Sequence, residues 1–135
     1  MPSEYRWDEP LRIIRTRFWG HVTNEDLIMQ AMAVYGNPRL GPPLGELVDL
    51  SEVKSTEVTI NALRKVVQID IGHSERFEGL STAIVAPTDE LRSMAQAFAT
   101  LSEVYDSPTS VRIFGTHDQA EQWLAALRKA KGPPG

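Results

Sequence analysis

Residues 47–63, LVDLSEVKSTEVTINAL, contain the change of pattern that decides the fold. The run ELVDL, which includes the first four of these residues, is short and mostly apolar, as expected of a strand buried on both faces. From about Thr56 to Ile71 the apolar residues instead recur at helical spacing, and Ser55 or Thr56 is predicted to cap that helix. A buried strand followed directly by an amphipathic helix is the repeating unit of α/β proteins. The apolar stripe predicted for this helix consists of Ile60, Leu63, Val67 and Ile71.

The same pair of patterns occurs twice more towards the C-terminus. LSTAIVA (residues 80–86) is an apolar run, and a helix with one apolar face follows it, capped by Thr88. SVRIFG (residues 110–115) is followed by Thr116, whose spacing to Gln119 is that of a capping box, and then by a final amphipathic helix. Because crossovers between parallel strands are right-handed, these units predict a mainly parallel sheet.

The N-terminal part is predicted to form a β-hairpin. EYRWDEPLRIIRTRFWG (residues 4–20) contains two strand-like runs that are broken at Glu9-Pro10. A helix follows, with capping-box spacing between Thr23 and Asp26. We therefore predict a single α/β domain over residues 1–131, in which the hairpin precedes β/α units and a mainly parallel sheet of about four or five strands carries about four helices. Residues 132–135 are expected to form a flexible tail.

The composition excludes several classes of function. The net charge is −4, and the 14 Lys and Arg residues form no long basic run, which argues against nucleic acid as a partner. The chain has no cysteine, so disulfides, thiolate catalysis and cysteine-ligated zinc are excluded. No apolar run approaches the ~20 residues that span a bilayer, and the N-terminus lacks the pattern of a secretory signal. A cytoplasmic protein without stable membrane insertion is therefore expected.

Both faces of the predicted sheet are apolar. Alternation along the strands places Leu80, Thr82 and Ile84 towards the helices and leaves a second apolar face on the opposite side. If the helices stack on one side, that second face must be covered by the N-terminal hairpin, by a second copy of the chain or by an apolar ligand. The residues assigned to this possible dimer or ligand face are Leu47, Ala83, Val85 and Phe114.

Four segments carry a resemblance to a known family: FWGHVTNEDL (18–27), ELVDLSEV (46–53), TAIVAPTDELRSMAQAF (82–98) and VRIFGTHDQAEQWL (111–124). In their order and local pattern they resemble the STAS domain of sulphate transporters and anti-sigma-factor antagonists, and more closely its SpoIIAA-like branch of short bacterial proteins. The resemblance spans nearly the whole chain. It implies a right-handed β/α superhelix with helices mostly on one face of the sheet, and a relation to lipid-carrying CRAL-TRIO domains.

The resemblance also implies a regulatory site. In STAS proteins that act as phosphorylation switches, a strand ending in Asp-Leu-Ser precedes a helix that begins with Asp-Ser-Ser-Gly-Leu, and the second serine of that motif accepts the phosphate. Residues 49–51 match the first part. In the second part Thr59 takes the acceptor position, but Ile60 stands in place of the glycine and the serine pair is absent. Thr59 is thus a candidate phospho-acceptor, and a plain helix cap without phosphorylation is the alternative reading of this stretch.

Polar residues are also expected where the strands end, which is where open parallel sheets bind their ligands. The candidate crevice residues are Asp49, Ser51, Asp89 and His117. Each has a local role available as a cap or turn acceptor, and no spacing shows that His117 reaches a carboxylate and a nucleophile, so no catalytic residue is predicted. The three histidines lack metal-pair spacing, and the prolines in GNPRLGPPLG (residues 36–45) remove amide donors that could cradle a phosphate. No metal or cofactor is expected.

These observations favour a non-enzymatic, STAS-like regulatory or interaction domain that acts by protein–protein contact or by binding a small ligand. The alternative function is a carrier or sensor of a lipid-like hydrophobic small molecule. A homodimer is the expected assembly, with a protein partner or a hydrophobic small molecule as the further partner. The fold alone identifies neither the protein partner nor the small molecule, because one scaffold hosts many unrelated activities.

Overall fold

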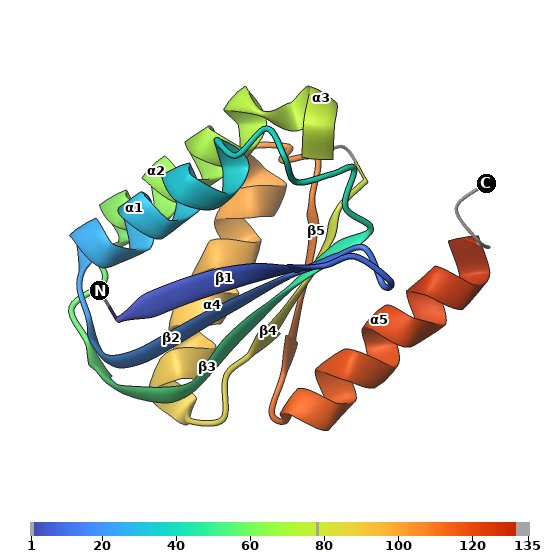
Figure 1. Ribbon diagram of the computed structural model, residues 1–135. Helices are drawn as coiled ribbons and strands as arrows, with labels where there is room; N and C mark the ends of the chain where they lie inside the picture. Colours follow the sequence, from blue (N-terminus) through green and yellow to red (C-terminus); the bar gives the residue numbers. More distant parts are fainter. Residues whose placement is uncertain (1, 78, 132–135) are drawn as a thin grey trace.

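The computed structural model describes residues 2–77 and 79–131 (Figure 1), so the tail expected at 132–135 lies outside the described residues. Five strands form one sheet in the order β1-β2-β3-β4-β5. β1 runs antiparallel to β2, and the other neighbouring pairs are parallel. The predicted α/β fold, with an N-terminal hairpin and a mainly parallel sheet, is confirmed. The strands are β1 (Ser3–Asp8), β2 (Ile13–Val22), β3 (Gly45–Thr56), β4 (Ser81–Val85) and β5 (Ser110–Phe114).

The helices cover the two faces of the sheet unequally. Three of them, α1, α2 and α4, lie together on one face, and α5 lies on the other (Figure 1). The single turn α3 follows α2 directly and was not expected from the sequence. The helices are α1 (Asn24–Tyr35), α2 (Ile60–Gly72), α3 (Ser74–Phe77), α4 (Asp89–Val104) and α5 (His117–Lys131).

Threonine hydroxyls begin three of these helices as predicted. The Thr23 hydroxyl accepts a hydrogen bond from the Asp26 amide (3.2 Å), and the Asp26 carboxylate accepts one from the Thr23 amide (2.9 Å), which completes a capping box. Thr88 and Thr116 each accept a hydrogen bond from the amide three residues later. Each cap satisfies an amide that has no partner within its own helix.

β3 is longer than predicted, and this moves the start of α2. The sequence predicts a strand over residues 46–50, but β3 extends to Thr56 because the ten-residue β2 pairs with it as far as Val22. Ser55 and Thr56 are therefore strand residues, and the prediction that one of them caps the helix is wrong. Thr59 is the cap, and its hydroxyl accepts a hydrogen bond from the amide three residues later at 3.3 Å.

The buried side of α2 also differs from the predicted stripe. Ile60 and Ile71, both assigned to that stripe, are 51% and 37% exposed. The buried positions instead have the i, i+3, i+4, i+7 spacing of one helix face, and one of them is a carboxylate that the predicted apolar stripe did not include. The buried residues of α2 are Ala62, Leu63, Val66, Val67 and Asp70.

The predicted alternation along β4 and β5 is present in the structure. Ile84 and Ile113 belong to the apolar cluster on the side of α4, whereas Val85 and Phe114 belong to the cluster on the side of α5. Because β4 and β5 are parallel and in register, each pair lies side by side on one face. Each face of the sheet therefore contributes to its own apolar core, and both cores are formed within this chain.

The second face is covered by α5, which corrects an expectation from the sequence. The residues predicted as an open dimer or ligand face are Leu47, Ala83, Val85 and Phe114, and they pack beneath α5. After β5 the chain crosses to this face of the sheet, and the helix that follows, α5, covers it in place of the N-terminal hairpin (Figure 1). Gly45 lets the helix approach closely, since an added Cβ would lie 2.8 Å from Cδ2 of Leu124. An ion pair between Arg15 of β2 and Glu121 also holds α5 in place.

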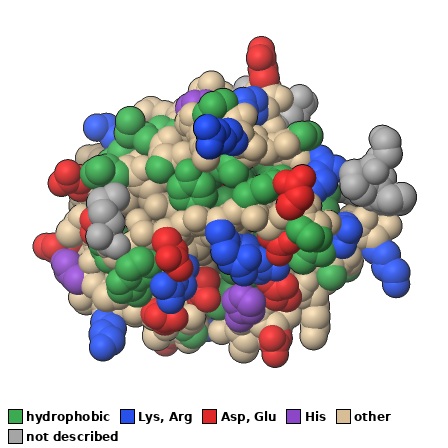
Figure 2. Space-filling model, viewed as in Figure 1, with side chains coloured by type: hydrophobic (Ala, Val, Ile, Leu, Met, Phe, Trp, Pro, Cys, Tyr) green, Lys and Arg blue, Asp and Glu red, His purple; other side chains and the backbone are tan. Residues whose placement is uncertain are grey.

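The charged side chains follow no single-sign pattern on the face shown in Figure 2. Lys and Arg residues are interspersed there with Asp and Glu, and they form no continuous basic patch. This agrees with the net charge of −4. That face therefore lacks the clustered positive charge that a phosphate backbone requires.

Candidate functional site

A buried carboxylate lies where the sheet meets the three-helix layer. Glu46, the second residue of β3, is 5% exposed. One of its oxygens accepts a hydrogen bond from the Thr16 hydroxyl of β2 (2.9 Å), and the other accepts one from the Tyr35 hydroxyl at the end of α1 (3.0 Å). Burial raises the pKa of Glu46, and the two hydroxyl donors oppose that shift.

A second buried carboxylate, Asp70 of α2, lies in the same region and is 1% exposed. Burial is the largest cause that raises its pKa to about 7; the Tyr35 hydroxyl lowers the pKa, and the nearby charge of Glu46 raises it further. The pKa of Tyr35 is raised well above its ordinary value, first by burial and then by the two carboxylates. Tyr35 and Glu46 thus join α1 to β3, and Asp70 of α2 lies close to them although neither of its carboxylate oxygens has a hydrogen-bond partner among the described residues.

Next to this group is an internal cavity of about 90 Å³. Its floor is the helix-facing side of β2, β3 and β4, and α1, α2 and α4 form its roof. Most of the wall is apolar and includes Phe18, Val48, Leu63 and Phe98. The polar side chains that line it are Thr16, Gln30, Tyr35, Glu46 and Thr82.

The polar lining of the cavity is concentrated towards one end. Glu46 and Thr82 are paired across β3 and β4, and Thr16 pairs with Val48, so the three polar side chains lie at neighbouring positions of the sheet. Further along the same strands the lining residues include Leu50 and Ile84, which are apolar. The cavity is therefore amphipathic, with a hydrogen-bonding end and an apolar end.

Gln30 of α1, which lines this cavity, has one unpaired hydrogen-bonding group. Its side-chain oxygen accepts a hydrogen bond from the Ser3 hydroxyl at 3.0 Å. Its side-chain nitrogen, although buried, has no hydrogen-bond partner among the described residues. A buried donor left without a partner costs about 1–3 kcal/mol, so such a group is a natural contact for a bound molecule.

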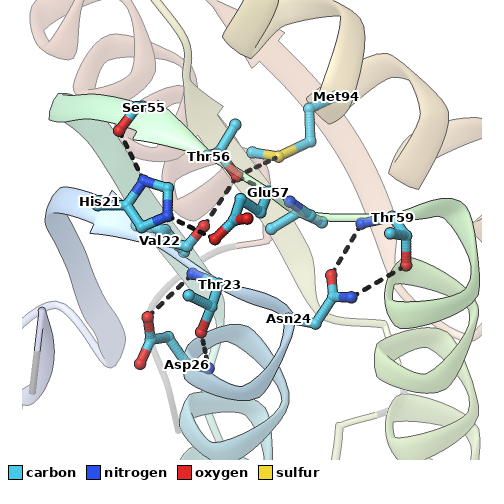
Figure 3. A network of polar contacts seen from close by, with 11 residues as sticks. His21, Val22, Thr23, Asn24, Asp26, Ser55, Thr56, Glu57, Thr59 and Met94 are labelled. Carbon is cyan, nitrogen blue, oxygen red and sulfur yellow. Dashed lines mark hydrogen bonds and ion pairs between the residues drawn. The ribbon is translucent and has the colours of Figure 1, made fainter.

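A different polar network lies on the surface, where β2 and β3 end and α1 and α2 begin (Figure 3). Asn24, the first residue of α1, makes two hydrogen bonds to Thr59. Its side-chain oxygen accepts from the Thr59 amide at 2.8 Å, and its side-chain nitrogen donates to the Thr59 hydroxyl at 3.2 Å. The two helix starts are thereby held side by side, and Thr59 remains exposed.

His21 occupies the neighbouring part of this surface network. Its Nδ1 lies 2.6 Å from the Ser55 hydroxyl, and its Nε2 lies 2.7 Å from a carboxylate oxygen of Glu57 (Figure 3). All three side chains are exposed. We use the name helix-start surface for the set His21, Asn24, Ser55, Glu57 and Thr59, together with the exposed Ile60.

The four predicted crevice residues are occupied by local contacts. Asp49 accepts hydrogen bonds from the amide and hydroxyl of Ser51 within β3, where the pairing with β2 shifts register. Asp89 forms an ion pair with Arg92, three residues later on α4. His117 Nε2 lies 3.9 Å from Oε1 of Glu121 on the same helix, α5. The contacts made by Asp49, Asp89 and His117 do not join them to one another. In the part of the chain that the structure describes, no three His, Cys, Asp or Glu residues are grouped so that they could hold a metal ion.

Sequence reasoning missed the buried polar residues. Glu46 stands at the start of the apolar run ELVDL, and a charge in a strand expected to be buried on both faces was a signal of a partnered interior carboxylate. Asp70 was similarly detectable, because it lies seven residues after Leu63 on the same helix face. The unpaired side-chain nitrogen of Gln30 had no such signal in the sequence. Whether a buried donor finds a partner depends on the residues that the fold places around it.

No protein-family model matches the chain, and no curated protein matches its sequence. Solved structures do match it, among them two over most of its length. An uncharacterised protein of the DUF3478 family from Shewanella loihica PV-4, described as having a SpoIIAA-like fold, is 14% identical and has a TM-score of 0.57, with 90% of this chain and 93% of that chain covered. The chain has the SpoIIAA-like fold.

The second match is the anti-sigma factor antagonist SpoIIAA in its unphosphorylated form. It is 10% identical, with a TM-score of 0.53, and the match covers 91% of this chain and 97% of that chain. At such identities the likeness to SpoIIAA defines the fold and leaves activity open. Within the described residues, no helix has both the length and the apolar character needed to cross a membrane.

Proposed function

We propose that the chain is a non-enzymatic regulatory domain of the cytoplasm that acts by binding a protein partner through the helix-start surface. The observation that carries this proposal is the rigid coupling of two exposed helix starts by the paired hydrogen bonds between Asn24 and Thr59. The SpoIIAA-like fold supports it, because one structure with this fold is an anti-sigma factor antagonist. The local contacts of the crevice residues support a role without catalysis.

The composition of the helix-start surface suits a protein contact. Ile60 is a large apolar side chain of this surface that is 51% exposed, directly after the cap Thr59. His21 and Glu57 supply polar groups that already hold each other in position. Protein interfaces combine apolar anchors with a polar rim in this way, and anchors near the centre contribute most of the binding energy.

Regulation by phosphorylation at Thr59 is part of the proposal. The hydroxyl is exposed and lies at the first turn of α2, where free amides and the helix dipole favour negative charge. A phosphate there would displace the Asn24 side chain, which now donates to the same hydroxyl. Modification of Thr59 would therefore change both the charge and the geometry of the proposed contact.

A lipid carrier, the alternative function, finds less support. The internal cavity measures about 90 Å³, which is smaller than the roughly 150 Å³ that accommodates benzene in an engineered protein core. A long acyl chain would require the helical layer to move off the sheet. A homodimer through Leu47, Ala83, Val85 and Phe114 would likewise require α5 to detach, so we propose neither.

Site-specific photo-crosslinking tests the proposed surface. A photoreactive amino acid is placed at Ile60 and, as a matched control, at Val104, which is 68% exposed at the end of α4. In cells that express the chain natively, we expect one dominant protein adduct from position 60 that is absent from position 104. The purified partner should then bind the wild type and lose affinity for Ile60→Asp. Equal adducts at both positions, or unchanged binding of Ile60→Asp, would contradict the proposal.

A further inference from the structure

The internal cavity is separate from the helix-start surface and is built as a polar-ended apolar site. Its apolar walls come from both layers, with Phe18 and Val48 on the sheet and Leu63 and Phe98 on the helices. Its polar lining includes a buried carboxylate, Glu46, and a buried amide, Gln30. A core packed only for stability would place apolar side chains at these positions, because buried polar groups stabilise only when they are fully hydrogen-bonded.

The open hydrogen-bonding positions define what the cavity can bind. The Gln30 side-chain nitrogen is a donor that has no partner among the described residues, so the ligand must offer an acceptor. The Glu46 carboxylate receives two hydrogen bonds and has room for more, since each of its oxygens can accept two, so the ligand should also offer a donor.

Charged ligand groups meet these requirements poorly. An ammonium group only donates and would leave the Gln30 nitrogen without an acceptor. A carboxylate only accepts, so it has no donor to offer Glu46, and it would be repelled by the charge of that carboxylate, which lines the cavity. A hydroxyl group donates and accepts at once, directly or through one bridging water, and it is neutral.

The size of the cavity restricts the apolar part of the ligand. A volume of about 90 Å³ is well below the 150 Å³ of a dry cavity that binds benzene, which has six non-hydrogen atoms, so it suits about three to four of them. Met94 and Phe98 of α4 line the apolar end, and the flexible methionine can adapt to a branched ligand.

We propose that this cavity is a binding site for a small neutral alcohol, whose hydroxyl group contacts Gln30 and Glu46 and whose short branched hydrocarbon part contacts the apolar walls. Such binding would stabilise the packing of α1, α2 and α4 on the sheet, because the ligand contacts all three helices. It is independent of the protein contact proposed at the helix-start surface.

The test is a methyl NMR titration of the purified full-length chain with 2-propanol and, separately, with xenon as a purely apolar probe. We expect 2-propanol to shift the methyl signals of Val48, Leu63 and Ile84 in a saturable manner. Gln30→Leu should weaken 2-propanol binding at least tenfold and leave xenon binding intact. Ala95→Leu, which fills the cavity from α4, should remove the response to both probes.

Each alternative outcome contradicts the proposal. Xenon binding without 2-propanol binding would identify a dry apolar void, and no response to either probe would show that the cavity admits no ligand. Equal 2-propanol affinity in the wild type and Gln30→Leu would show that Gln30 makes no contact with the hydroxyl group. Should Gln30→Leu fail to fold, as judged by circular dichroism, Gln30→Met keeps the side-chain length and serves the same comparison.

Discussion

The hydroxyl of Tyr35, the last residue of α1, donates a 3.0 Å hydrogen bond to the Glu46 carboxylate at the start of β3. Both side chains are at least 95% buried, since their exposed fractions are 5%. This bond joins the helical layer to the sheet at the polar end of the cavity. Because it satisfies a buried carboxylate, its loss has consequences for stability and for titration.

Tyr35→Phe is expected to lower the free energy of unfolding by about 1–3 kcal/mol, because it leaves Glu46 with one donor fewer in a buried site. Urea denaturation at pH 7 measures this change. The matched control is Tyr105→Phe, at a tyrosine that is 40% exposed, where a change within about 0.5 kcal/mol is expected. Equal effects of the two substitutions would show that the buried bond contributes nothing of its own.

The stability of the chain should decrease as the pH rises from about 4 to about 7. The pKa of Asp70 is 3.8 in its ordinary state and about 7 in the folded chain, chiefly because of burial, so the folded chain binds the proton more tightly. The stabilisation is present in full below the lower value and is lost as the pH rises through the upper one. A shift of about three pKa units corresponds to roughly 4 kcal/mol, and the raised pKa of Glu46 acts in the same direction.

Asp70→Asn isolates the contribution of that carboxyl. The variant should flatten the plot of unfolding free energy against pH between about 4 and 8, because it cannot ionise, and it should exceed the wild type in stability at pH 8. Asp118→Asn, at an exposed position of α5, is the control and should keep the wild-type slope. A slope unchanged by Asp70→Asn would assign the pH dependence to other groups.

Docking of α5 is expected to contribute strongly to stability. Leu124 is 2% exposed between the helix and the second face of the sheet, so Leu124→Ala should cost about 2–5 kcal/mol. Gln122→Ala, at an exposed position of the same helix, should have little effect. Thermal or urea unfolding provides the measurement. A negligible change for Leu124→Ala would mean that α5 is not fastened to the sheet in solution.

The role of Thr59 as a cap can be separated from its proposed role in regulation. Thr59→Ala removes the acceptor for the amide at the start of α2 and should cost about 1 kcal/mol, whereas Thr59→Asp keeps a capping oxygen and should cost little. Ser55→Ala is the control, because Ser55 lies in β3 and caps no helix. Urea denaturation measures the three variants, and Thr59→Ala should be the least stable. If Ser55→Ala were instead the least stable, Ser55 would be the cap of α2.

Local sequence patterns predicted much of the fold because they depend on neighbours in the chain. Thr23 and Asp26 lie three residues apart, so the hydrogen bonds of the capping box could be inferred without knowing where the helix packs. The alternation of Ile84 and Val85 between the two sheet faces follows from the pleat of the strand in the same way. Boundaries were less certain, since the length of β3 depends on its distant partner β2.

The sequence by itself determined the order of the strands and of the four longer helices, the caps of three of these helices and the two apolar faces of the sheet, because each is set by contacts between residues a few positions apart. Only the tertiary structure decided that α5 covers the second face, that Asn24 meets Thr59 across two helix starts, and that Glu46 and Gln30 line one cavity. These relationships join residues that are far apart along the chain. Their free energies depend on burial and on the direction of each side chain, which exist only once the layers have packed.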